Sequence, residues 1–429
     1  MTPLGAAEFA RLMAPLGPFG RRPSLAVAVS GGADSLALAL LADHWARARG
    51  GGILGLVVDH RLRPASAAEA VVTRDRLARR GIAARILVLD GLAPGPALAA
   101  RARAARYATL ESSCAAAGIV DLLLGHHAAD QAETLALRLL GGSGPDGLAG
   151  MPALAEHEHV RLLRPLLSVP PGRLRATLQA AGEGWVEDPS NADPAATRAR
   201  LRALRRDRDG VGPTTAAAVA AAGARGRTRA MRERAIAALL ARRVRMAPEG
   251  FATLAPGALA PEALAALLRT LAGADFSPSP AQVAALATRP RAGTLGGVQL
   301  LSAGALCPGG WLLVREAAAA APACAACPGT VWDGRFRLES AAPLPPGAEI
   351  AALGAASAGL RRASDLPSAV LRSLPGVRLR GKLAVAPHLG YGDGLMKTVV
   401  SVVFRPAHAL AAAPFLAAPS RLAGNGGRE

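Results

Sequence analysis

The chain has 429 residues, 51% of them hydrophobic, which is enough for two or three domains with apolar cores. It has no continuous apolar run of about 18 residues, no signal-peptide pattern at its first residues and only four cysteines, so we expect a cytoplasmic protein without a membrane-spanning helix. The formal net charge of +19 favours a polyanionic partner, nucleic acid above all.

Strand and helix patterns alternate from residue 22 to about residue 125. Short apolar runs predict strands at 25–29, 53–58, 84–89 and 120–124. Longer segments predict helices at 36–49, 67–80 and 96–117. Such alternation predicts an α/β fold with a doubly wound parallel sheet, whose ligands bind at the carboxyl ends of the strands.

The turn between the first strand and the first helix has the composition of a pyrophosphate-binding loop. Its residues are Ser30, Gly31, Gly32, Ala33, Asp34 and Ser35. The glycines let the backbone approach a ligand closely, and the helix N-terminus favours an anion. Asp34 is placed to ligate a phosphate-bound Mg²⁺. The lysine of a Walker loop is absent, which argues against transfer of a γ-phosphate. The alternative is an ordinary turn with a serine cap.

Polar residues also follow the second and fourth predicted strands. Asp59 and His60 come after the second, where they suit a nucleotide pocket or simply cap a strand end. Asp130 and Glu133 open a helix after the fourth and lie three residues apart, so both carboxylates share one helical face. Such a pair can bind an ammonium group or Mg²⁺ and help to remove a proton from an amine. Alternatively, the histidine pair at 126–127 is merely hydrogen-bonded at the strand end; a zinc site would need a third or fourth soft ligand, and none is adjacent.

The rest of the chain predicts further domains. Residues 1–209 form the expected α/β domain, and an arginine-rich segment near its end includes Arg198, Arg200 and Arg202. After a Gly-Pro boundary at 210–213, residues 214–320 are expected to form a mostly helical, tRNA-binding domain and 325–418 a small α+β domain. The Asp-Gly pair at 333–334 predicts a hairpin, and the tail 419–429 is expected to be disordered.

Taken together and in this order, the motifs resemble the tRNA(Ile)-lysidine synthetase family of PP-loop ATP pyrophosphatases. The matching segments are SGGxDS at 30–35, VDHxLRP at 58–64, Arg-Ala-Ala-Arg-Tyr at 103–107, GHHxxDQxET at 125–134, GLAGM at 147–151 and EDPSN at 187–191. The resemblance implies a ligase that uses ATP and Mg²⁺ to adenylate the C2 oxygen of the wobble cytidine in an isoleucine tRNA with a CAU anticodon. Free lysine then displaces AMP.

The resemblance also implies roles for single residues. The loop 30–35 would bind pyrophosphate, with Asp34 on Mg²⁺, while Asp59 and His60 would line the nucleotide pocket. Arg103 would face the adenylated intermediate or phosphate. Asp130 and Glu133 would receive the lysine ammonium. Phosphates of tRNA would contact Arg198, Arg200 and Arg202, although a solvated arginine-rich helix is an equal alternative.

Some features remain open. Family members carry arginine where this chain has Gly141, and the pair Cys324 and Cys327 has no account beyond chance. The oligomeric state, a homodimer included, is not indicated. The nearest rival is a PP-loop tRNA cytidine 2-thiolation enzyme, which is disfavoured because the core up to residue 205 holds only Cys114. A non-catalytic RNA-binding protein would have a broken loop or lack the carboxylates, and a PP-loop amidotransferase would leave the basic excess unexplained.

Overall fold

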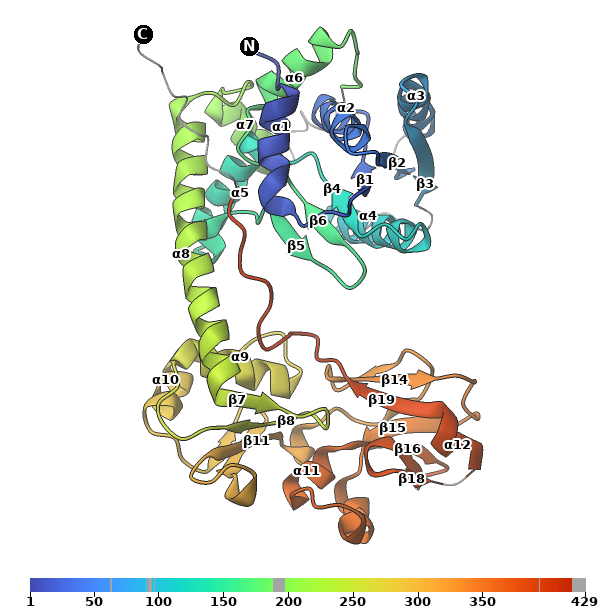
Figure 1. Cartoon of the computed structure of the whole chain (residues 1–429), viewed down its shortest axis with the longest axis vertical. Coiled ribbons are helices and arrows are strands. Elements are labelled where there is room, and N and C mark those ends of the chain that lie inside the picture. The colour runs from blue at the N-terminus through green and yellow to red at the C-terminus, as the bar shows by residue number, and fades with distance from the viewer. Residues whose placement is uncertain are drawn as a thin grey trace. The chain divides into compact units, whose positions relative to one another are not determined.

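A computed structural model of the chain divides into two compact units (Figure 1). It describes residues 1–61, 64–89, 91, 95, 97–187, 197–392 and 394–418, apart from the side chains of residues 363 and 395. The first unit joins Met1–Met231 to the C-terminal residues from Ala413 onward, and the second is Arg232–Ala412. The expected disordered tail, 419–429, lies outside the described residues.

A six-stranded sheet in the order β3-β2-β1-β4-β6-β5 forms the centre of the first unit. All neighbouring strands are parallel except β5 and β6, which pair antiparallel. The strands are β1 (Ser24–Ala28), β2 (Gly52–Asp59), β3 (Ala83–Val88), β4 (Asp121–Leu123), β5 (Leu154–Glu156) and β6 (Arg161–Leu163). The helices are α1 (Ala6–Met13), α2 (Ala33–Arg47), α3 (Ser66–Arg79), α4 (Leu98–Ala116), α5 (Ala128–Leu140), α6 (Pro171–Ala180), α7 (Thr197–Arg205) and α8 (Pro213–Arg243).

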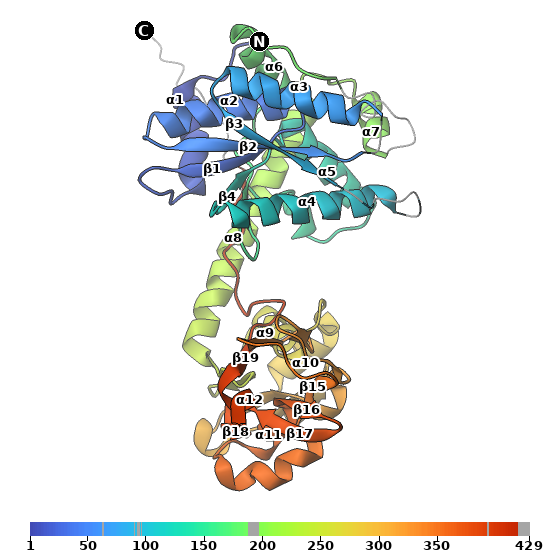
Figure 2. The same cartoon turned by 90° about the vertical axis from the view of Figure 1, so that its right-hand side faces the viewer.

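Helices cover both faces of this sheet because its strands are apolar on both sides. Leu25 and Val27 of β1 are fully buried in one core with residues of α1, α2, α3 and α6. Ala26 points to the opposite face, as the period of a strand requires, and is buried against α4. Figure 2 shows α1, α2, α3 and α6 on one side of the sheet and α4 on the other. The predicted doubly wound α/β fold is therefore confirmed; strands β5 and β6 were not predicted.

The end of the first unit differs from the boundary expected at residues 210–213. This turn is anchored, since the carboxylate of Asp207 accepts hydrogen bonds from the backbone N–H groups of Val211 and Gly212, both at 3.0 Å, and contacts Thr215 in the first turn of α8. Helix α8 therefore continues from the α/β core, and the division between the units falls within it. Residues from 413 to 418 also belong to the first unit: the N–H of Ala153 donates to the carbonyl of Leu416 at 2.8 Å.

The second unit contains three antiparallel sheets. Their orders are β7-β8-β11-β10-β9, β12-β15-β16-β17-β18 and β13-β14-β19. The strands are β7 (Val244–Met246), β8 (Phe251–Leu254), β9 (Gly293–Leu295), β10 (Val298–Ser302), β11 (Trp311–Arg315), β12 (Cys324–Ala325), β13 (Val331–Trp332), β14 (Phe336–Ser340), β15 (Ala348–Ala352), β16 (Pro375–Leu379), β17 (Lys382–Ala386), β18 (Tyr391–Gly392) and β19 (Val400–Phe404). The helices are α9 (Pro261–Ala272), α10 (Pro280–Thr288), α11 (Ser368–Ser373) and α12 (Gly394–Val399).

Two sequence expectations bear on this unit. The Asp333-Gly334 hairpin is confirmed, because β13 and β14 pair around it. Residues 214–320 hold α8, α9 and α10, as expected of a mostly helical region, but also the five strands β7–β11, which were not predicted. No helix among the described residues is long and apolar enough to cross a membrane.

Candidate active site

The loop after β1 is closed by its own serines. The hydroxyl of Ser35 accepts a hydrogen bond from the backbone N–H of Ser30 at 3.1 Å and donates to the carbonyl of Gly32, also at 3.1 Å. Gly32 is the N-cap of α2 and supplies no side-chain cap. The first-turn N–H groups of α2 therefore have no helical partner and remain able to bind an anion.

Gly31 holds the loop in a conformation that other residues avoid. Its φ is +85°, and a Cβ placed there would lie 2.5 Å from Oγ1 of Thr73 on α3. Its carbonyl accepts a hydrogen bond from the N–H of Val186 at 2.9 Å, which brings the segment after α6 against the loop. Both the dihedral angle and the close approach therefore require glycine at this position.

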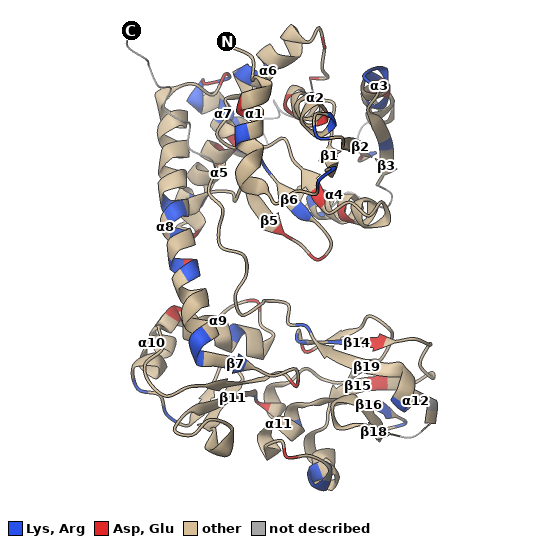
Figure 3. Cartoon of the chain, in the orientation of Figure 1, with Lys and Arg blue, Asp and Glu red and all other residues tan. Residues whose placement is uncertain are grey.

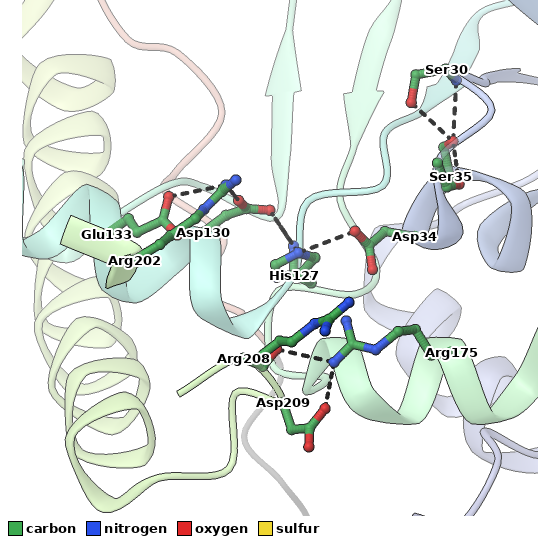
Figure 4. Close-up of polar contacts among 11 residues, drawn as sticks. Ser30, Asp34, Ser35, His127, Asp130, Glu133, Arg175, Arg202, Arg208 and Asp209 are labelled. Atoms are coloured by element: carbon green, nitrogen blue, oxygen red, sulfur yellow. Dashed lines mark hydrogen bonds and ion pairs between the residues drawn. The ribbon is translucent and has the colours of Figure 1, made fainter. Parts of the chain in front are cut away.

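The acidic pair of α5 lies in the wall of the same cavity and already holds a cation. Glu133 is fully buried and Asp130 nearly so. Arg202 of α7 donates from Nε to Oε1 of Glu133 at 2.6 Å and from Nη2 to Oδ1 of Asp130 at 3.2 Å (Figure 4). The two carboxylates thus face one point, as their spacing predicts, and that point suits a positively charged group.

His127 links the acidic pair to the loop at residues 30–35, the phosphate loop. Its Nε2 lies 3.3 Å from Oδ2 of Asp34 and 3.5 Å from Oδ2 of Asp130 (Figure 4). Burial opposes the charged form of His127, but the carboxylates of Asp130 and Asp34 outweigh it and raise the pKa of His127 to about 9. At neutral pH an imidazolium therefore bridges two carboxylates. Oδ1 of Asp34 is buried without a hydrogen-bond partner among the described residues, so this oxygen is placed to ligate a cation.

Arginines surround Tyr107 of α4, next to the cavity wall that Arg106 forms. Arg106 of α4 lines the cavity, whereas Arg103 lies on the exposed side of the helix and donates from Nη2 to the Tyr107 hydroxyl at 3.3 Å. Buried Arg164 also faces Tyr107, and burial lowers its pKa. His126 lies among these guanidinium groups, and burial lowers the pKa of His126 to about 3. Sequence reasoning selected Arg103 and missed Arg106, which is three residues further along the same helix.

The two residues predicted for the nucleotide pocket point in different directions. His60 lines the cavity. Asp59 is buried, and its Oδ1 accepts hydrogen bonds from the hydroxyl of Ser66 at 2.6 Å and the N–H of Arg61 at 3.0 Å. Although burial opposes ionisation, these hydrogen bonds lower the pKa of Asp59 below its usual range. Asp59 therefore anchors the chain entering α3 rather than facing the cavity.

These walls enclose a cavity of about 960 Å³ at the carboxyl ends of β1, β2 and β4. The phosphate loop, the acidic pair and further residues to which the sequence analysis gave no role all contribute to it. Those additional lining residues are Arg106, Arg175, Trp185, Val186, Arg205, Arg206 and Arg208. Of the three predicted tRNA-binding arginines, Arg202 lines the cavity, while Arg200 is exposed and donates to Thr197 at 3.3 Å, and Arg198 is half-buried.

Comparison with known proteins places this architecture in a family. The PP-loop domain family matches residues 4–206. A protein of Mesorhizobium japonicum named tRNA(Ile)-lysidine synthase is 38% identical over 383 residues, covering 84% of this chain and 81% of its own length. The chain belongs to the tRNA(Ile)-lysidine synthase family.

Other members of the tRNA(Ile)-lysidine synthase family match to different extents. The protein of Rhizobium meliloti is 35% identical over 397 residues, which is 86% of this chain and 82% of that protein. The protein of Bradyrhizobium sp. (strain BTAi1) is 44% identical over 204 residues, 47% of this chain. The chain spans 56% of the length of that relative and of a second one, from Bradyrhizobium diazoefficiens.

One departure from the pattern expected of the lysidine synthase family has a local substitute. Gly141 stands at the end of α5 where an arginine was expected. Arg138, three residues earlier, donates from Nη1 to the carbonyls of Gly147 at 2.6 Å and Gly150 at 2.7 Å. The amide of Gln131 exchanges two hydrogen bonds with the backbone of Met151, at 2.7 and 3.0 Å. The glycine-rich segment that follows α5, residues 141–151, is therefore held by side chains of α5 without an arginine at position 141.

The cysteine pair of the second unit has no metal-binding partners among the residues that the structure describes. Cys324 and Cys327 are free and exposed. In the part of the chain that the structure describes, no group of three or more His, Cys, Asp or Glu side chains is placed to hold a metal ion. Magnesium is not excluded by this, because it keeps several waters and needs only one or two protein carboxylates beside substrate phosphates.

Proposed function

We propose that this chain attaches free L-lysine to C2 of the wobble cytidine of an isoleucine tRNA with a CAU anticodon. ATP is cleaved to AMP and pyrophosphate. The observation that carries the proposal is that one cavity holds both an anion-binding loop, 30–35, and a buried carboxylate pair, Asp130 and Glu133, that already binds a guanidinium. Family membership and the names of the relatives agree with it.

In the first step the cytidine O2 attacks the α-phosphorus of ATP and pyrophosphate leaves. The N–H groups at the start of α2 and the hydroxyl group of Ser30 would bind the leaving pyrophosphate, while Ser35 holds the loop in shape through its contacts with Ser30 and Gly32. The unpartnered Oδ1 of Asp34 fits Mg²⁺, and a bound Mg²⁺ would supply charge neutralisation at the phosphates. His127 holds the other Asp34 oxygen in place.

In the second step the lysine amine attacks C2, and AMP leaves with the former O2. Pyrimidine C2 is a weak electrophile, and adenylation converts its oxygen into a good leaving group. Glu133 and Asp130 bind the ammonium and accept its proton as the amine reacts. Because Arg202 donates to both carboxylates, lysine must displace the guanidinium or share the carboxylates with it.

A thiolation enzyme is the second candidate, and the cavity disfavours it. Within the described residues no cysteine lines the cavity. Cys114 lies on the buried face of α4 within the apolar core, where burial raises its pKa to about 11, so a thiolate is not available there. An amine nucleophile therefore fits the site better than sulfur.

The experiment is an ATP cleavage assay with purified full-length protein. We expect the protein to form AMP and pyrophosphate over many catalytic cycles only when ATP, Mg²⁺, lysine and the CAU tRNA are all present. Asp34→Asn should abolish this, while Asp43→Asn, on the same helix but paired with Arg47 at the surface, should not. The proposal would be wrong if AMP formation required a sulfur donor and did not depend on lysine.

A further inference from the structure

Helix α8 carries a row of arginines on one exposed face. Arg227, Arg234 and Arg242 are seven and eight residues apart, so they lie within about 80° of arc around the helix axis. Met231 and Ala238 lie between them on the same face, and all five residues are exposed. We call these five residues the basic face. Figure 3 shows basic residues as blue bands along α8.

The arginines of the basic face differ from others of α8 that serve the fold. Arg229 donates to the carbonyl of Asp146 at 3.1 Å, and Arg243 donates to the carbonyl of Ala255 at 2.9 Å. By contrast, no acidic side chain among the described residues pairs with a guanidinium of the basic face. Some arginines of α8 therefore make contacts within the fold, whereas those of the basic face are exposed to solvent.

The spacing of these guanidinium groups fits a polyanion better than a single anion. At 1.5 Å per residue they are spread along about 22 Å of the axis, so one phosphate or carboxylate cannot contact all three. A nucleic-acid duplex carries a negative charge about every 1.7 Å of its length and offers several phosphates over that distance. Guanidinium groups also match the geometry of phosphate oxygens.

We infer that the basic face of α8 binds the sugar–phosphate backbone of RNA, outside the catalytic cavity. This rests on the proposed function, because it takes the tRNA substrate as the polyanion. A membrane surface fits less well, since the face offers only Met231 and Ala238 as apolar groups. Contacts to the sugar–phosphate backbone do not distinguish one base sequence from another, so they would serve to position the tRNA.

The test is a binding measurement on the full chain with the CAU tRNA, without lysine or ATP. The variant is Arg227→Gln with Arg234→Gln and Arg242→Gln, since glutamine removes the charge and keeps helix propensity. The control, Arg225→Gln with Arg289→Gln and Arg361→Gln, removes the same charge from exposed arginines elsewhere. Arg225 is on α8 itself, about 160° around the helix from Arg227.

We expect the basic-face variant to bind tRNA about tenfold more weakly at physiological salt, with the slope of log K against log salt reduced by about 2 to 3. The control should keep the affinity and slope of the unmodified protein. Equal behaviour of the two variants overturns the inference and leaves the proposed function standing if the unmodified protein still forms lysidine. No tRNA binding by the unmodified protein overturns both. Loss of binding to phosphatidylserine vesicles, with tRNA binding unchanged, assigns the face to a membrane and overturns the inference.

Discussion

Arg202 and Glu133 form a charge-assisted contact of 2.6 Å, although α7 and α5 are separated by 69 residues of sequence at this point. Glu133 is fully buried, and the Arg202 side chain is 39% exposed. Helix α7 has no buried residues, so contacts such as this one hold it against α5. Under the proposed function, the substrate ammonium would compete with Arg202 for the carboxylate of Glu133.

Replacing the buried acid should therefore affect lysine more than ATP. Glu133→Gln keeps the shape of the side chain and removes one charge. Loss of a hydrogen bond between charged groups costs about 1.5–3 kcal/mol, so we expect the KM for lysine to rise by about tenfold or more. The KM for ATP should hardly change. Glu187→Gln, which removes an exposed carboxylate from the rim of the same cavity, is the control. An unchanged KM for lysine would refute the role of Glu133.

Removing the guanidinium should make lysine a stronger stabiliser. Arg202→Gln leaves the buried Glu133 carboxylate without its cation, which should lower the free energy of unfolding by about 1–3 kcal/mol, less than for a fully buried pair. Added lysine then supplies the missing cation. We expect lysine to raise the melting temperature of this variant more than that of the unmodified protein. If lysine raised the melting temperature of the variant less than that of the unmodified protein, Arg202 would help to bind lysine instead of occupying the site of its ammonium group.

The phosphate loop offers two neighbouring glycines with opposite expectations. Gly31→Ala places a methyl group at φ +85° and 2.5 Å from Thr73, so it should destabilise the fold and greatly reduce AMP formation. At Gly32 the φ is −73° and the nearest atom, Oγ of Ser30, would be 3.6 Å away. Gly32→Ala should therefore fold normally. The comparison uses thermal unfolding together with AMP formation, and equal stability of the two variants would contradict the strain at Gly31.

His126 should make the protein less stable in mild acid. Burial, opposed by Asp130 and reinforced by the charges of Arg164, Arg103 and Arg106, lowers the pKa of His126 to about 3. The unfolded residue takes up a proton near pH 6.5, whereas the folded one does not, so its contribution is intact above pH 6.5 and is lost as the pH falls toward 3.

Between pH 7 and pH 5.5, the titration of His126 should lower the free energy of unfolding by about 1 kcal/mol. Urea unfolding of the unmodified protein and of His126→Gln at both pH values isolates that difference, because all other groups are common to the two. Parallel changes in the two proteins would show that His126 is not held neutral by the fold.

Local patterns were sufficient to predict four of the six strands of the sheet, and the loop after the first of them. The strands at 25–29, 53–58, 84–89 and 120–124 follow from short apolar runs, and the loop follows from glycines between a strand and a helix. The acidic pair on α5 follows from helical periodicity. These features depend on residues close in sequence, where a pattern constrains geometry directly.

Contacts between distant segments could not be predicted in this way. Asp59 and His60 are adjacent, but successive side chains leave a strand on opposite sides, so only His60 reaches the cavity. Arg202 was assigned to tRNA, and nothing in its local sequence indicates that it contacts Glu133. Arg106 differs from Arg103 only in its position along α4, which depends on how the helix packs on the sheet.

The most direct test of the account is the product itself. The purified protein is incubated with ATP, Mg²⁺, isotopically labelled lysine and an unmodified isoleucine tRNA bearing a CAU anticodon, and the nucleosides are then analysed by mass spectrometry. We predict that the label appears in a lysine-substituted cytidine at the wobble position and is lost with Asp34→Asn. Unlabelled cytidine at that position, in a tRNA that the protein binds, would contradict the account.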